Sequence, residues 1–100
     1  MSGADYRIAW RPKASEGLRS IVRYIAQDSP AGARTFGKKL REKVRPLAQL
    51  PLLGHEGRPG LPADVRELVL HPNYIAFYRV IESSRTVEIL RVKHVAQQTP

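Results

Sequence analysis

Residues 65–93 read VRELVLHPNYIAFYRVIESSRTVEILRVK, and this stretch decides the fold. It contains three runs rich in strand-forming residues, which we predict to be strands: Val65–Leu70, Tyr74–Ile81 and Thr86–Lys93. Only His71–Asn73 and Glu82–Arg85 separate them. Connections this short join antiparallel neighbours, because parallel strands need a long crossover. We therefore expect a small antiparallel sheet in this part of the chain.

Two helices are expected upstream of these strands. Apolar residues recur there at spacings of three and four: Ala14, Leu18, Ile21 and Ile25 in one run, and Ala33, Phe36, Leu40, Val44 and Leu47 in the next. Pro12 and Pro30 suit the first turns of these helices, and Ser29 can cap the second. Pro46 should kink or end the second helix. The turn between the helices is short, which favours an antiparallel hairpin.

The predicted order of elements is β-α-α-β-β-β. The first strand is expected over Tyr6–Trp10. The Pro- and Gly-rich residues 50–64 form a loop and not a linker between domains, because the remaining chain is too short to fold alone. We predict an α+β fold in which an antiparallel helical hairpin packs on a small, mainly antiparallel sheet, as a single domain over residues 1–100.

Composition argues against several kinds of protein. The 100 residues include no Cys, so a disulfide framework, thiolate catalysis and Cys-based metal sites are ruled out. The histidines are scattered at positions 55, 71 and 94 and offer no paired metal ligands. No apolar run approaches the ~20 residues of a membrane span. We expect a small, soluble, cytoplasmic protein that needs no metal or cofactor and no membrane.

Positive charge is concentrated in one segment. The chain carries a formal charge of +8, and residues 34–45 hold six basic residues against one acid, Glu42, a local sum of +5. We expect this surface to attract a polyanion or an acidic protein, through Lys38, Lys39, Arg41, Lys43 and Arg45. The alternative is that these side chains only solvate the outer face of a helix.

The predicted sheet has more apolar surface than one helical layer can cover. In Tyr74–Ile81 both alternating sets of side chains are largely apolar, and in residues 86–94 neither set is polar throughout. An antiparallel sheet with one wet face normally alternates between apolar and polar residues. We therefore expect a partner to cover the second face. The alternative is that the loop 50–64 or the C-terminal tail folds over it.

Three arginines lie among apolar neighbours in the predicted strands: Arg66, Arg79 and Arg91. A half-buried arginine needs a carboxylate or phosphate partner, and Glu67 and Glu88 are the nearest acids in sequence. An ion pair within the sheet and an anion-binding role both remain open. His94 ends the last strand and would serve either in packing and hydrogen bonding or as an acid or base near neutral pH.

Five segments carry a family resemblance: Gly57–Gly60, Arg66–Val69, Tyr74–Val80, Val87–His94 and Ala96–Gln98. In this order they resemble the RelE/ParE superfamily of bacterial toxins, most closely its ParE branch. With the helical hairpin, the resemblance covers about residues 6–98. It implies the toxin of a type II toxin–antitoxin system, a class associated with growth inhibition and plasmid stabilisation.

The resemblance also implies a partner. Toxins of this superfamily are neutralised by an antitoxin, here a ParD-like one, whose acidic and partly disordered segment folds on binding in a toxin–antitoxin hetero-oligomer. Such a partner would explain the second apolar face and the basic surface. The residues expected to contact it are Tyr74, Phe77, Tyr78, Arg66, Arg79 and Arg91.

The two branches imply different targets. ParE-type toxins poison DNA gyrase by binding, whereas RelE-type toxins cut mRNA on the ribosome and need a base, an acid and cations. RelE-type sequences usually carry an Arg where this chain has Ile75, and an Arg and a Tyr near the C-terminus, where it has neither after His94. We therefore expect a gyrase inhibitor, with a ribosome-dependent mRNA endonuclease as the alternative. Candidate catalytic residues for the alternative are His94, Arg58, Arg79 and Arg91.

Overall fold

The computed structural model describes residues 5–96 and contains an α-hairpin on a five-stranded sheet. The first half consists of β1 (Arg7–Trp10), α1 (Pro12–Ala26), α2 (Pro30–Val44) and a 3₁₀ helix, η1 (Arg45–Ala48). The second half consists of β2 (His55–Glu56), β3 (Arg66–His71), β4 (Tyr74–Ile81), a 3₁₀ helix η2 (Glu82–Ser84) and β5 (Thr86–His94). The predicted α+β fold is confirmed, and β2 is the strand that the sequence analysis missed.

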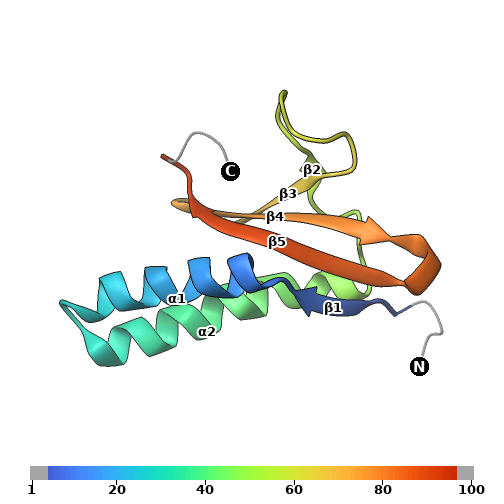
Figure 1. The fold of residues 1–100 in the computed structure, drawn as a ribbon. Coiled ribbons are helices and arrows are strands. Elements are labelled where there is room, and N and C mark those ends of the chain that lie inside the picture. Colours follow the sequence, from blue (N-terminus) through green and yellow to red (C-terminus); the bar gives the residue numbers. More distant parts are fainter. Residues whose placement is uncertain (1–4, 97–100) are drawn as a thin grey trace.

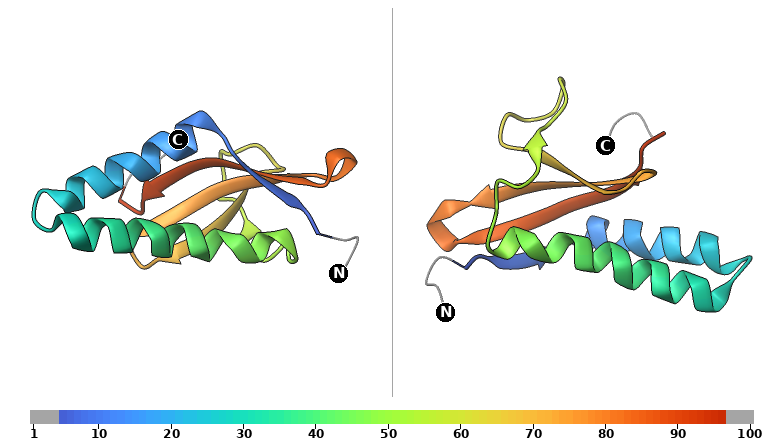
Figure 2. Two further views of the ribbon diagram at one scale, coloured as in Figure 1. Left: turned by 90° about the horizontal axis from the view of Figure 1, so that it is seen from below. Right: turned by 180° about the vertical axis from the view of Figure 1, so that it is seen from behind.

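The molecule has a helical layer and a sheet layer, with a loop rising from the far side of the sheet. The strand order is β1-β5-β4-β3-β2, in which β1 runs parallel to β5 and the other pairs are antiparallel. Both helices cover one face of the sheet, and the loop that carries β2 projects from the other (Figure 1). The views from below and behind show the same two layers (Figure 2).

The local signals that predicted the helices act as expected. The Ser29 side chain caps α2 by accepting a hydrogen bond from the Gly32 N–H at 3.1 Å. The α-helix ends at Val44 and tightens into η1, where Pro46 cannot donate to an α-helical hydrogen bond. The helical stripe packs on the sheet in one core that includes Leu18, Leu40, Leu47, Tyr78 and Ile89, each at most 2% exposed.

A β-bulge in β5 overturns the predicted assignment of side chains to the two sheet faces. Phe77 pairs with Arg91 and Tyr78 pairs with Ile89, so Leu90 is an extra residue. The alternation therefore changes sides at the bulge. Val87, Ile89 and Val92 all face the helices, while Glu88, Leu90 and Arg91 lie on the open face. The mixed pattern in residues 86–94 is thus one apolar face interrupted by a bulge.

The expectation that the second face awaits a partner is wrong for its aromatic centre. Ile75 and Phe77 are 8% and 5% exposed, because Val65 and Leu61 of the preceding loop pack on them. The alternative, that the loop 50–64 folds over this face, describes that part of the sheet. Val69, 54% exposed, remains an uncovered apolar side chain.

Element boundaries differ from the predictions by one residue. The first strand begins at Arg7 and not Tyr6, β3 covers Arg66–His71 and not Val65–Leu70, and β5 continues to His94. Gln97 and Gln98, which end the resemblance, lie outside the described residues.

Candidate functional site

The candidate site is the open face of the sheet, where a loop closes over the apolar centre. Residues 57–65 turn back on themselves, with the Gly57 N–H donating to the Val65 carbonyl oxygen at 3.0 Å. A side chain at Gly57 would bring its Cβ within 2.6 Å of that oxygen, so the close approach requires glycine. This turn places Leu61 and Val65 over Phe77.

An ion pair clamps the same loop to β3. The Arg58 guanidinium donates to both carboxylate oxygens of Glu67, Nε to Oε2 at 2.9 Å and Nη2 to Oε1 at 3.1 Å. The backbone N–H of Arg58 also donates to Glu67 Oε2 at 2.8 Å. These hydrogen bonds lower the pKa of the Glu67 carboxyl, which is only 3% exposed, and raise the pKa of Arg58. The guanidinium carbon lies 5.5 Å from the Phe77 ring centre, a cation–π contact.

A groove of about 600 Å³ runs between this loop and the start of α1. We call it the open-face groove. Its apolar lining comes from Pro12, Leu61, Pro62, Val65, Phe77 and Leu90, and its charged lining from Arg11, Lys13, Arg79 and Arg91. All four charged residues are basic. The groove therefore combines an apolar floor with a cationic rim.

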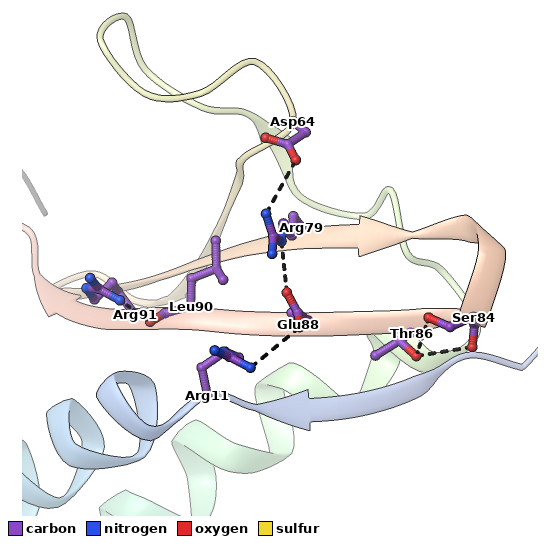
Figure 3. Close-up of polar contacts among 8 residues, drawn as sticks. All are labelled: Arg11, Asp64, Arg79, Ser84, Thr86, Glu88, Leu90 and Arg91. Carbon is purple, nitrogen blue, oxygen red and sulfur yellow. Dashed lines mark hydrogen bonds and ion pairs between the residues drawn. The ribbon is translucent and has the colours of Figure 1, made fainter.

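Part of the rim belongs to a charge network across the sheet (Figure 3). Arg79 Nε lies 2.8 Å from Glu88 Oε1, and its Nη1 lies 3.9 Å from Asp64 Oδ2. Arg11 reaches the other oxygen of Glu88 at 3.9 Å. The hydrogen bond that Arg79 donates to Glu88 raises the pKa of the Arg79 guanidinium. Of the two open alternatives for the strand arginines, Arg79 shows the ion pair within the sheet, with Glu88, whereas Glu67 pairs with Arg58 and not with Arg66.

Arg91, like Lys13, is a rim cation that this network leaves out. Its Nη1 donates to the Leu90 carbonyl oxygen at 2.9 Å, and among residues 5–96 no carboxylate lies within 4 Å of it. The bulge at Leu90 turns its side chain to the open face. Figure 3 shows it separated along β5 from the pair of Arg79 and Glu88. Arg91 is therefore well placed to receive an external anion.

A second groove of about 1050 Å³ adjoins the first through Lys13 and Arg91, which line both. It lies between α1 and the end of β5, and its lining includes Lys13, Arg23, Tyr24 and His94. The His94 ring stacks edge-on against Tyr74 at 5.2 Å between centres, and its Nδ1 accepts a hydrogen bond from the Ala96 N–H at 3.0 Å. Packing and hydrogen bonding, one of the two roles considered for His94, are thus observed.

The structure separates the predicted antitoxin contacts into two groups. Phe77, Arg79 and Arg91 line the open-face groove. Tyr74 and Tyr78 belong to the helix-facing side, where Tyr74 lies against Phe36 and Tyr78 is 0% exposed. A completely buried tyrosine offers no surface to a partner in this conformation.

Arg66 and Tyr78 instead hold the loop that follows η1. The Tyr78 hydroxyl donates to the Pro51 carbonyl oxygen at 2.8 Å and accepts from the Gly54 N–H at 3.0 Å. Arg66 Nη2 donates to the carbonyl oxygens of Gly54 and Leu52 at 2.6 and 3.3 Å. These contacts are structural. Carbonyl oxygens here accept from Nη2 of the arginine for which the sequence suggested a carboxylate or phosphate, whereas its buried Nε has no hydrogen-bond partner among the described residues.

Several groove residues were not identified from the sequence: Arg11, Leu61, Pro62, Val65 and Leu90. The signal at Leu90 was the broken alternation in β5, which we interpreted as a second apolar face and not as a bulge. The loop residues carry no periodic signal, because a loop has no regular repeat.

Among the described residues, no group of three or more His, Asp or Glu side chains is arranged to hold a metal ion.

The basic residues of the second helix are all exposed, and they divide between two sides of it. Lys38, Arg41 and Arg45 lie on one side, together with Arg34, whereas Lys39 and Lys43 point toward another, as the 3.6-residue repeat requires. Arg41 stacks over the Trp10 ring with 5.7 Å between the guanidinium carbon and the ring centre.

In the part of the chain that the structure describes, no helix has the length and hydropathy of a membrane-crossing segment.

The sequence of the chain is similar to those of known proteins. Residues 8–99 match the family described as "ParE toxin of type II toxin-antitoxin system, parDE". A curated protein of Sinorhizobium fredii named "Putative toxin Y4kP" is 41% identical over 95 residues, which cover 94% of this chain and 93% of that protein.

Solved structures share the fold over almost the whole chain. The chromosomal ParDE toxin–antitoxin system from P. aeruginosa superposes with a TM-score of 0.76 and 29% identity, covering 93% of this chain and 99% of that one. The intact E. coli RelBE toxin–antitoxin complex superposes with a TM-score of 0.64 and 18% identity, covering 92% and 99% of the two chains. At that identity the RelBE likeness shows a common fold and no more.

Proposed function

This chain belongs to the ParE toxin family of type II toxin–antitoxin systems, and from this premise we propose that it inhibits DNA gyrase by binding and is neutralised by a ParD-like antitoxin. The observation that carries the proposal is the family match over residues 8–99 together with the ParDE structure at a TM-score of 0.76. Such a target would have the protein act in the cytoplasm.

The contacts of the candidate catalytic residues support a toxin that acts by binding its target and not by cleaving RNA. Catalytic RNA cleavage needs cations that remain available to the phosphate. Of the candidates, Arg58 is held by Glu67 and Arg79 by Glu88. His94 already accepts a backbone hydrogen bond at Nδ1. These contacts support structural roles for three of the four candidate catalytic residues, the exception being Arg91.

The open-face groove fits an acidic amphipathic segment of the antitoxin. Its floor offers partly buried Leu61 and Leu90 to apolar side chains, and its rim offers Arg91 and Lys13 to carboxylates. Apolar anchors surrounded by charge complementarity are typical of protein interfaces. Since Phe77 is already covered, the partner would contact the margin of the apolar cluster and not its centre.

A supercoiling assay tests the proposed target. Purified toxin is incubated with gyrase, ATP and relaxed plasmid, with and without a twofold excess of antitoxin. We expect loss of supercoiling and accumulation of linear DNA, both reversed by antitoxin. Unchanged supercoiling at a large excess of folded toxin would refute gyrase inhibition.

The groove is tested by charge reversal at Arg91. Arg91→Glu should weaken antitoxin binding at least tenfold, because like charges at a desolvated contact cost several kcal/mol. Arg19→Glu makes the same charge change on the exposed surface of α1 away from the groove and should leave the affinity within about twofold. Equal losses in the two variants would contradict the assignment of the groove.

Ribosome-dependent mRNA cleavage is the second candidate, favoured by the presence of Arg91 and His94 in the second groove. Primer extension on a translated message distinguishes it from gyrase inhibition. A ribonuclease would produce codon-spaced cuts that His94→Gln removes. The gyrase proposal predicts no such cuts and unchanged gyrase inhibition by His94→Gln.

A further inference from the structure

One side of α2, continued by Arg45 at its C-cap, carries a row of four basic residues, which we call the α2 basic stripe: Arg34, Lys38, Arg41 and Arg45. Their spacings of four, three and four residues place them on one side of the helix, within about 50–60° of one another. At 1.5 Å per residue the row is about 16 Å long. Successive charges are thus separated along the axis by about 4.5–6 Å.

Nothing in the described part of the protein neutralises this row. Among residues 5–96, none of its four members has a carboxylate within 4 Å, although Glu42 is on the same helix. All four are exposed. By contrast, the rim of the open-face groove binds Glu88 and Asp64 in ion pairs. Unpaired cations held close together on one helix repel one another, and a polyanion bound there would relieve this repulsion.

The surroundings of the stripe distinguish a polyanion from an acidic protein. Protein interfaces centre on large apolar or aromatic anchors. The large apolar residues exposed in the described part of the chain are Tyr24, Leu50, Leu52, Leu53, Val69 and Val95, and none is in α2. A phosphate backbone needs no apolar anchor, because its binding is driven by counterion release. The stripe therefore suits phosphates better than a protein.

The absence of exposed aromatic rings on α2 also bears on the kind of nucleic acid. Single strands bind to aromatic platforms on which bases stack. Phe36, the aromatic residue of α2, faces His71 and Tyr74, and Trp10 is covered by Arg41. We propose that the α2 basic stripe binds the phosphate backbone of duplex DNA without reading its sequence. The choice of DNA rests on the proposed function, because gyrase holds a DNA duplex.

Salt dependence gives the proposal a quantitative test. Four phosphate contacts predict a slope of about −3.6 in log K against log salt, equivalent to about a 150-fold loss of affinity between 50 and 200 mM KCl. Fluorescence anisotropy of the full chain with a labelled 30-base-pair duplex measures this slope. Arg34→Gln with Lys38→Gln removes two contacts and should halve it, leaving about a 12-fold loss over the same range.

The same helix supplies the matched control. Lys39→Gln with Lys43→Gln removes the same charge from another side of α2 and should leave the slope within about 0.5 of wild type. Circular dichroism checks that both variants fold. If the Arg34 and Lys38 double variant does not fold, Lys38→Gln alone should reduce the slope by about 0.9.

Several outcomes would overturn the proposal. The first two are no duplex binding at 50 mM KCl and an equal loss of salt slope in the two double variants. The third is tighter binding of single-stranded DNA or RNA than of the duplex. The fourth is that Arg34→Gln with Lys38→Gln changes the affinity for the antitoxin alone. The last outcome would assign the stripe to an acidic protein. The supercoiling assay separates this proposal from the proposed function. Gyrase inhibition without duplex binding refutes the stripe alone, and duplex binding with normal supercoiling refutes the gyrase target alone.

Discussion

Replacing Arg58 by Ala tests the clamp that holds the loop 57–65 over the sheet. The substitution removes two side-chain hydrogen bonds to Glu67 and leaves its carboxylate, 3% exposed, with the Arg58 backbone N–H. Breaking a buried ion pair costs about 3–5 kcal/mol. Since the Arg58 side chain is 35% exposed, water compensates for part of the loss. We expect the free energy of unfolding to fall by about 2–3 kcal/mol at pH 7.

The pH dependence of this loss identifies its cause. In the wild type, the Arg58 hydrogen bonds lower the pKa of Glu67 in the folded state. Their stabilisation is therefore complete above the unfolded pKa of about 4.3 and is lost as the pH falls through the folded pKa. In Arg58→Ala, burial without a cation raises the pKa of Glu67, and protonation relieves the cost. The stability difference should therefore narrow as the pH falls from 7 to 3.

Urea unfolding at pH 7, 5 and 3, followed by Trp10 fluorescence and circular dichroism, measures both effects. Arg19→Ala removes an exposed cation and should change stability by less than about 0.5 kcal/mol. Arg58→Ala with Glu67→Gln removes both charges and should be more stable than Arg58→Ala alone at pH 7. A constant stability difference between pH 7 and pH 3, or a double variant less stable than the single, would refute the reasoning.

Three further substitutions test contacts of the fold. Tyr78→Phe removes a buried hydroxyl and leaves the Gly54 N–H without its acceptor, so urea unfolding should show a loss of about 1–3 kcal/mol, and no loss would contradict the observed network. Gly17→Ala would place a Cβ 2.6 Å from the Val92 carbonyl oxygen and should lower thermal stability by about 1–3 kcal/mol, whereas an unchanged melting temperature would show that α1 can move. Ser29→Ala removes the α2 cap and should lower the free energy of unfolding by about 1 kcal/mol, with Ser29→Asp expected to restore it.

The elements of the fold could be predicted because their signals are local. The helical stripes ending near Ile25 and Leu47, the cap at Ser29 and the stop at Pro46 all act within a few residues of where they occur. Strands β4 and β5 were recognisable from their β-branched and aromatic residues. Prediction was weaker where a partner distant in sequence decides the structure, as for β2, which exists only by pairing with Arg66 and Glu67.

The open face could be only partly predicted, for two physical reasons. A bulge such as that at Leu90 depends on register, and one extra residue reverses the facing of all that follow. Arginine partners depend on where loops return to the sheet, so Glu67 pairs with Arg58 across nine residues and not with its neighbour Arg66. Phe77, Arg79 and Arg91 were among the six residues expected to contact an antitoxin, but most of the residues that complete their groove come from a loop and a helix start.

The sheet separates the two surfaces that the proposals assign to different partners. The open-face groove, with its apolar floor, lies on the side from which the loop projects, and the α2 basic stripe is in the layer that covers the other side (Figure 1). A peptide segment seated in the groove would therefore leave the stripe uncovered. A peptide segment that neutralises the toxin by blocking the groove should then abolish gyrase inhibition. The toxin should retain its salt-dependent binding of duplex DNA. An antitoxin peptide that fills the groove and also abolishes duplex binding would show that the two surfaces are not independent.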